Sequence, residues 1–184
     1  MTQAAGAAGG LAIAGASAPF IASLAPSERA KAAGAPVEAR LEELKPAELH
    51  TVEWRGRPVW ILRRTPDMLA RLDSVLGQLS DPDSEVASQQ PKYARNAIRS
   101  RRPELFVTVA LCTHLGCVPS YRPEPGSLQA GWPGGFYCPC HGSKFDLAGR
   151  VFKGSPAPTN LVVPPYSFSG EGVVMIGADE TTKA

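Results

Sequence analysis

The chain has 184 residues, and its 19 Lys and Arg against 17 Asp and Glu give a formal net charge of +2. That length accommodates one compact domain of about 140 residues plus an appendage, because single domains cluster near about 100 to 150 residues. The basic residues are scattered rather than interleaved with aromatic residues, so the composition argues against nucleic-acid binding.

The N-terminal segment carries no charge from Met1 to Ser27. As a helix rising about 1.5 Å per residue it is long enough to cross a bilayer. It is rich in Ala and Gly, so we expect residues 1–25 to be a single transmembrane anchor that packs against helices of a partner membrane protein. The alternative is a cleaved secretory signal, with an A-x-A-like site at residues 16–18 but without the usual basic start.

Residues 26–37 contain polar residues, Ala, Gly and Pro, a composition that resists packing. We expect a flexible hinge linker here, with an Ala-rich helical spacer as the alternative. The head domain is expected over residues 38–184. Its first element is predicted from "ELHTVEWRGRPVWILRR", in which two strand-type runs flank a turn and form a hairpin. His50 lies in the first run without ligand-type neighbours, so it is expected to be a surface or half-buried strand residue.

A helix is predicted from "TPDMLARLDSVLGQL", where Thr65 can cap and Pro66 suits the first helical position. Its apolar residues recur at helical spacing and are expected to face the core; they are Met68, Leu69, Leu72, Val75, Leu76 and Leu79. A long polar stretch follows, which includes the densest basic run, Arg99, Arg101 and Arg102. This run is expected to be a solvated loop edge rather than a docking site.

Further strands are predicted in "LFVTVAL", which leads into Cys112, and in two runs of "LVVPPYSFSGEGVVMIG" around a Gly-containing turn. One helix among short strands and Pro- or Gly-containing turns indicates a mainly β, antiparallel domain with ligand loops projecting from it.

All four cysteines and two of the three histidines lie in "CTHLGC" (112–117) and "CPCHGSKFD" (138–146). The spacings are C-x-H and C-x-x-H, with one additional cysteine in each loop. Zinc and metal-free disulfides remain alternatives, but disulfides alone leave both histidines unexplained. A two-iron, two-sulfide cluster with two thiolates and two imidazoles uses both pairs. Two ferric ions, two sulfides and two thiolates sum to zero charge, so such a cluster accepts an electron more readily than one with four thiolates.

These two motifs, with the downstream "GSPAPTNLVVPPY", resemble the Rieske iron-sulfur subunit of the proteobacterial respiratory cytochrome bc complex, the ubiquinol-cytochrome c reductase. The resemblance implies an antiparallel Rieske-type β domain with a cluster-binding subdomain at about residues 108–160. It also implies one 2Fe-2S cluster held by four residues of the two loops, which are Cys112, His114, Cys138 and His141. Cys117 would pair with Cys140 in a disulfide.

Other roles are implied for residues around the ligands. Leu115 would lie at the exposed tip and meet the quinone pocket of the cytochrome b subunit, unless it is an ordinary packing residue. Gly142 would contact the cluster, and the Ser143 hydroxyl would donate to a bridging sulfide unless it only caps a turn. Residues 154–158 would form the proline loop that covers the cluster, or only a rigid turn. Phe145 departs from the tyrosine common among respiratory relatives, which removes one hydrogen-bond donor.

The implied function is transfer of one electron from ubiquinol to a c-type cytochrome subunit, with His141 hydrogen-bonding the quinol and a proton released. The head would move on its hinge between the two partners. A disulfide requires an oxidising compartment, which predicts a bacterial inner-membrane protein with a periplasmic head. The alternatives are the small subunit of an arsenite-oxidase-type enzyme, a Rieske ferredoxin or oxygenase component, and a zinc-stabilised interaction module.

Overall fold

The computed structural model describes residues 15–25 and 34–179, and the chain divides into two units between Ala35 and Pro36. The described part of the first unit contains a helix over residues 15–23. Among the described residues, no helix combines the length and the apolar character needed to cross a membrane. Most of the expected anchor and linker lies outside the described residues. The strand β1 begins at Val37, the last residue of the expected linker.

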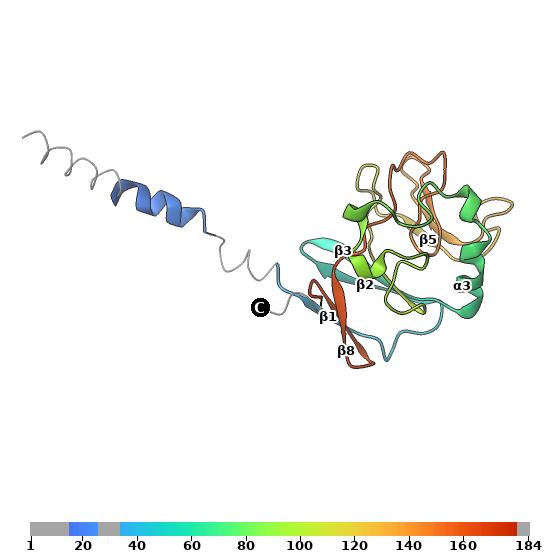
Figure 1. Cartoon of the computed structure of the whole chain (residues 1–184), viewed down its shortest axis with the longest axis horizontal. Coiled ribbons are helices and arrows are strands. Elements are labelled where there is room, and N and C mark those ends of the chain that lie inside the picture. The colour runs from blue at the N-terminus through green and yellow to red at the C-terminus, as the bar shows by residue number, and fades with distance from the viewer. Residues whose placement is uncertain (1–14, 26–33, 180–184) are drawn as a thin grey trace, which may run out of the picture. The chain divides into compact units, whose positions relative to one another are not determined.

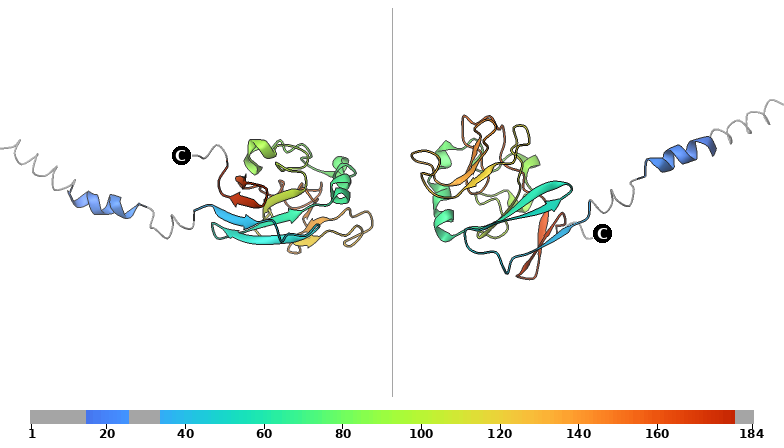
Figure 2. Two further views of the ribbon diagram at one scale, coloured as in Figure 1. Left: turned by 90° about the horizontal axis from the view of Figure 1, so that it is seen from below. Right: turned by 180° about the vertical axis from the view of Figure 1, so that it is seen from behind.

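The head contains three antiparallel sheets of three strands each within residues 34–179 (Figures 1 and 2). The first has the order β1-β9-β8, with β1 at Val37–Arg40, β8 at Tyr166–Ser169 and β9 at Val173–Ile176. The second has the order β2-β3-β4, with β2 at Leu49–Trp54, β3 at Arg57–Arg63 and β4 at Leu105–Val109. The third has the order β5-β6-β7, with β5 at Ser120–Arg122, β6 at Gly135–Tyr137 and β7 at Lys144–Phe145.

The second sheet confirms the predicted hairpin and the strand that precedes Cys112. Arg55 and Gly56 both have positive φ, 53° and 68°, as the tight turns that join antiparallel strands require. His50 is exposed on β2. All five residues of β4 are buried, because this strand of apolar and β-branched residues is covered on both faces. Its C-terminal end delivers Cys112 to the edge of the core.

The predicted helix is shorter in the structure. α3 spans Pro66–Asp73, and the Thr65 hydroxyl accepts a hydrogen bond from Met68 N at 3.2 Å, as its sequence predicted. The helix ends at Asp73, and the chain continues as a short 3-10 helix, Leu76–Gln78, around the poor helix former Gly77. The prediction that Leu76 faces the core is wrong, since its side chain is 39% exposed.

The polar stretch after α3 contains two further 3-10 helices, Ala87–Gln89 and Lys92–Ala94. The expectation that its basic run is a solvated edge is wrong for Arg99, which is 0% exposed. The Arg99 guanidinium donates to the Gln90 side chain at 2.9 Å, so internal oxygens replace its hydration. Counting charges along the sequence does not reveal these acceptors, because most of them are backbone carbonyls.

The third sheet carries the ligand loops and was not predicted, because its strands have only two or three residues and include Gly135. Phe136 joins it to the second sheet: its ring stacks on Trp60 with centroids 5.1 Å apart and contacts Tyr121 at 5.6 Å. In both figures β5 and the loops between residues 112 and 160 lie at one end of the head, away from β1 and β8.

Candidate metal centre

Two loops present the predicted ligands, and both are closed by the same hydrogen bonds. In the first ligand loop (residues 112–117), Cys112 N donates to Cys117 O at 2.8 Å and Gly116 N donates to Cys112 O at 2.9 Å. In the second ligand loop (residues 138–143), Cys138 N donates to Ser143 O at 2.8 Å and Gly142 N donates to Cys138 O at 2.9 Å. Each loop is therefore a tight bend that starts at a cysteine.

The fifth residue of each loop is a glycine for a conformational reason. Gly116 and Gly142 have φ of +81° and +80°, in the left-handed region that side chains with a Cβ disfavour. Gly116 was not predicted as a site residue, although its spacing from Cys112 matches that of Gly142 from Cys138. The Cys-to-Gly spacing that the two loops share was the feature of the sequence that could have identified Gly116.

A disulfide joins the two loops. Cys117 and Cys140 are bonded with an S–S distance of 2.08 Å and a Cα–Cα distance of 6.6 Å, which is the pairing that the resemblance implied. The Cys138 sulfur lies within 4.8 Å of both disulfide sulfurs. The disulfide ties the two loops together covalently. Its sulfurs carry no thiolate charge and are therefore poor metal ligands, so the available thiols are those of Cys112 and Cys138, which are buried and free.

The remaining donors of the two loops also lie close together. Burial, with a contribution from the neighbouring Cys112 thiol, raises the pKa of the Cys138 thiol. The rings of His114 and His141 are edge to face, with centroids 4.8 Å apart. His114 is half-buried and His141 is exposed, so the two imidazoles differ in their access to solvent.

One atom shows that this donor set suits a metal. The Nδ1 atom of His114 is buried without a hydrogen-bond partner, a state that costs about 1 to 3 kcal/mol. A cation bonded there would satisfy that nitrogen, and it would also stabilise the buried thiols as thiolates. Two thiols and two imidazoles fit a cluster in which one iron has cysteine ligands and the other has histidine ligands.

The proline loop (residues 154–158) is fastened next to both ligand loops. The Ser143 hydroxyl oxygen accepts from Ala157 N at 3.0 Å, and Ser155 accepts from Lys144 N at 3.1 Å. Thr113 donates its hydroxyl to Thr159 O at 2.7 Å. Because Ser143 acts as an acceptor toward the proline loop, its own proton remains available for an acceptor in the site.

The tip of the site is apolar and open to solvent. Leu115, which follows His114 in the chain, is 71% exposed, and Val118, which follows Cys117, is 51% exposed; His141 is exposed as well. Leu115 therefore does not pack as an ordinary core leucine. Phe145 is fully buried in the same core as Cys112 and Cys138.

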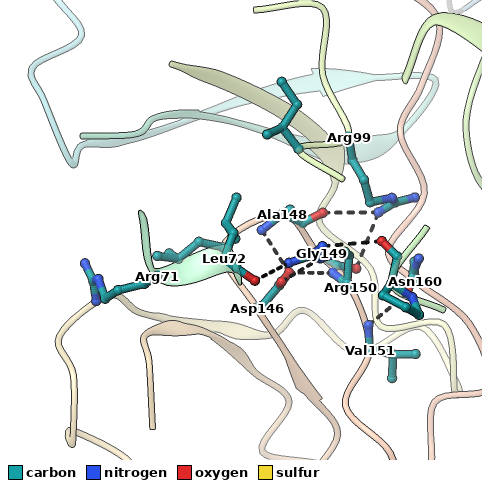
Figure 3. A network of polar contacts seen from close by, with 12 residues as sticks. Arg71, Leu72, Arg99, Asp146, Ala148, Gly149, Arg150, Val151 and Asn160 are labelled. Atoms are coloured by element: carbon teal, nitrogen blue, oxygen red, sulfur yellow. Dashed lines mark hydrogen bonds and ion pairs between the residues drawn. The ribbon is translucent and has the colours of Figure 1, made fainter. Parts of the chain in front are cut away.

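A buried polar network holds the loop that follows β7 (Figure 3). Asp146 pairs with Arg150 at 2.7 Å, and its other oxygen accepts from Ala148 N and Arg150 N at 2.9 and 2.8 Å. Arg150 also donates to Leu72 O at the end of α3 at 2.8 Å. Arg99 donates to the carbonyls of Ala148 and Gly149, and burial lowers its pKa to about 10.

Comparison with known proteins agrees with this geometry. A family profile described as the Rieske [2Fe-2S] domain matches residues 78–167. The chain is 56% identical over 163 residues to the ubiquinol-cytochrome c reductase iron-sulfur subunit of Allochromatium vinosum, covering 88% of this chain and 78% of that protein. The chain belongs to the Rieske iron-sulfur protein family.

Other relatives of this Rieske chain extend the comparison. The ubiquinol-cytochrome c reductase iron-sulfur subunit of Blastochloris viridis is 41% identical over 178 residues, which cover 96% of this chain and 88% of that protein. The chain spans about half the length of the mitochondrial Rieske subunits it matches in Nicotiana tabacum and Solanum tuberosum. A chain of a hyperthermophilic respiratory Complex III has the same fold, with a TM-score of 0.52 and 22% identity over 94% of this chain and 98% of that one.

Proposed function

We propose that this chain is the electron-transfer subunit of a ubiquinol-cytochrome c reductase, which oxidises ubiquinol and passes one electron to a c-type cytochrome through one 2Fe-2S cluster. The observation that carries the proposal is the donor set: two buried free thiols and two adjacent imidazoles on two loops that a disulfide joins. The relatives that are named ubiquinol-cytochrome c reductase iron-sulfur subunits support the choice of ubiquinol and a cytochrome as the reaction partners.

The proposed ligands are Cys112 and Cys138 for the buried iron and His114 and His141 for the outer iron. The difference in exposure supports this division, because both thiols are buried whereas His141 reaches solvent. When bound, a cluster with two imidazole ligands supplies a one-electron acceptor of higher potential than an all-cysteine cluster.

The chain's own residues prepare the reaction with quinol. The exposed imidazole of His141 is placed to hydrogen-bond the quinol hydroxyl and to receive its proton. Leu115 and Val118 form an apolar rim that fits a hydrophobic pocket of the cytochrome b subunit and excludes water from the contact. Gly142 allows the sharp bend beside His141. The Ser143 hydroxyl accepts from Ala157 N, so its O–H group can donate to a sulfide of the cluster.

The anchor and linker complete the proposal. Residues 1–25 would hold the chain in the bacterial inner membrane by a single span, and residues 26–37 would let the head reach both partners. The Cys117–Cys140 disulfide supports a periplasmic head, because disulfides persist in oxidising compartments.

The test is purification of the full chain with its partner subunits from membranes, followed by electron paramagnetic resonance after addition of quinol. We expect a Rieske signal in the wild-type chain and its loss in His114→Ala, His141→Ala, Cys112→Ser and Cys138→Ser. His50→Ala is the matched control, since this exposed histidine lies on β2 outside the site. A normal signal in any ligand variant contradicts the assignment, and reduction by arsenite but not by quinol selects the oxidase alternative.

A further inference from the structure

A cavity of about 550 Å³ opens beside the exposed ligand His141. His141 and Gly142 of the second ligand loop form one side of it, and residues 152–156 and the segment around Trp132 form the others. Its described lining contains two lysines, Lys144 and Lys153, and no carboxylate. We call it the lysine cavity.

The charges of the two lysines are not neutralised by the described part of the chain. Lys144 Nζ donates to the Gln129 side-chain oxygen at 2.8 Å, and Lys153 Nζ donates to Gly77 O at 2.8 Å. Both acceptors are neutral, and neither lysine forms an ion pair within residues 34–179. An ammonium has three donors, so each lysine is held in place by one bond and keeps two N–H groups for another acceptor.

The rest of the described lining does not oppose an anion. Trp132 and Phe152 line the cavity and pack against each other, with ring centroids 5.8 Å apart. The described lining therefore offers two ammonium groups and no negative charge. A carboxylate is the protein group that forms charge-assisted hydrogen bonds with such ammonium groups.

We propose that the lysine cavity receives an acidic side chain of the c-type cytochrome that accepts the electron. This inference rests on the proposed function and names a recognition element for its second half-reaction. A negative charge held beside His141 repels an electron on the head. The negative charge therefore favours donation of that electron to the acceptor, and it would oppose reduction of the head by quinol. The electrostatics thus assign the cavity to the acceptor rather than to the cytochrome b subunit.

The first test is zero-length cross-linking of the purified complex with a carbodiimide, which joins lysine amines to carboxylates that touch them. We expect mass spectrometry to find Lys144 or Lys153 joined to an Asp or Glu of the c-type cytochrome. A cross-link from these lysines to the cytochrome b subunit overturns the assignment. So does the absence of both cross-links when other lysine–carboxylate contacts in the complex are captured.

The second test measures the rate at which the reduced head passes its electron to the c-type haem. We expect Lys144→Gln/Lys153→Gln to slow this step by about three- to tenfold at low ionic strength, with the difference shrinking as salt screens the charges. Lys45→Gln/Lys92→Gln removes two exposed lysines outside the cavity and is the matched control.

The two hypotheses fail in different ways. If quinol does not reduce the wild-type head, the proposed function is wrong. If quinol reduces the head and both double variants pass the electron at the wild-type rate, the proposed function stands and the lysine cavity is not the recognition element.

Discussion

Single hydrogen bonds around the ligands are expected to set the reduction potential. The Ser143 hydroxyl accepts from Ala157 N and keeps its proton for the site. Ser143→Ala should lower the potential by up to about 60 to 130 mV, because a bond to a charged group is worth about 1.5 to 3 kcal/mol and about 59 mV is tenfold for one electron. Voltammetry measures this. Ser155→Ala, which removes another serine acceptor of a backbone N–H, is the control; an equal fall there means that loop loosening is the cause.

Phe145 offers the opposite change at the same scale. It is fully buried in the core that contains Cys112 and Cys138, where a tyrosine would add a hydrogen-bond donor. Phe145→Tyr should raise the potential by at most a similar amount, because a hydrogen bond to a ligand sulfur favours the reduced, more negative state. An unchanged or lower potential with a normal resonance spectrum shows that the new hydroxyl does not reach a sulfur. Thermal unfolding then reports the cost of leaving it unpaired.

The limits of sequence reasoning are clearest for individual residues. The C-x-H and C-x-x-H spacing predicted the loops, and the resemblance predicted the disulfide, because both depend on local residue types. The spacing does not distinguish half-buried His114 from exposed His141, since exposure depends on the tertiary packing rather than on the neighbours in the sequence. Arg99 was misassigned for a similar reason: its partners, such as Ala148 O, are distant in sequence.

At the scale of elements, the two ligand loops share a backbone bend that depends on glycine. Adding a Cβ at Gly116 meets no atom within 4 Å, and at Gly142 only the Tyr137 hydroxyl at 4.0 Å. Gly116→Ala and Gly142→Ala should therefore each cost about 1 to 2 kcal/mol of unfolding free energy from backbone strain alone. Gly77→Ala is the control, because Gly77 lacks a positive φ and has open space around it. Equal stability of all three variants in denaturant titrations contradicts the explanation.

The loop after β7 depends on its buried ion pair. Arg150 and Asp146 are almost fully buried, and Arg150 also bonds the end of α3 (Figure 3). Arg150→Met leaves the carboxylate of Asp146 buried without its cation, so we expect a loss of about 3 to 5 kcal/mol in unfolding free energy. Arg95→Met breaks the exposed pair with Glu85 and should cost less than about 1 kcal/mol. Similar losses in both variants by thermal unfolding mean that the buried network does not stabilise the loop.

Helices and strands were predicted correctly where their residue pattern extends over several neighbouring positions. They were missed or given wrong ends where tertiary contacts determine them. The hairpin of β2 and β3 and the start of α3 follow from residue types within about ten positions. β7 has only two residues, Lys144 and Phe145, and becomes a strand because it pairs with β6. The end of α3 was missed because Val75 and Leu79 pack with Trp132 and Phe152, which are distant in sequence.

At the scale of the whole molecule, the proposed function requires one head to serve two partners. The head is a separate unit from Pro36 onward, and the expected hinge occupies residues 26–37. Electron transfer slows steeply with distance, so a head that serves a quinol site and a cytochrome haem in turn must travel between them. The composition of the hinge, rather than any contact within the head, is then expected to limit delivery of the electron.

Stiffening this segment tests the idea directly. Prolines introduced between Ala30 and Gly34 should slow electron delivery to the c-type cytochrome while leaving the resonance spectrum of the head unchanged, because proline restricts the backbone only where it is introduced and these positions precede the head in the sequence. A six-residue Gly-Ser insertion at the same place lengthens the hinge without stiffening it. Comparing the two variants distinguishes an effect of hinge length from an effect of hinge flexibility. The measurement is the rate of haem reduction after a single turnover of quinol. If the proline variant and the insertion variant both keep the wild-type rate, the head does not have to move, and the acceptor must lie within reach of a single docked position.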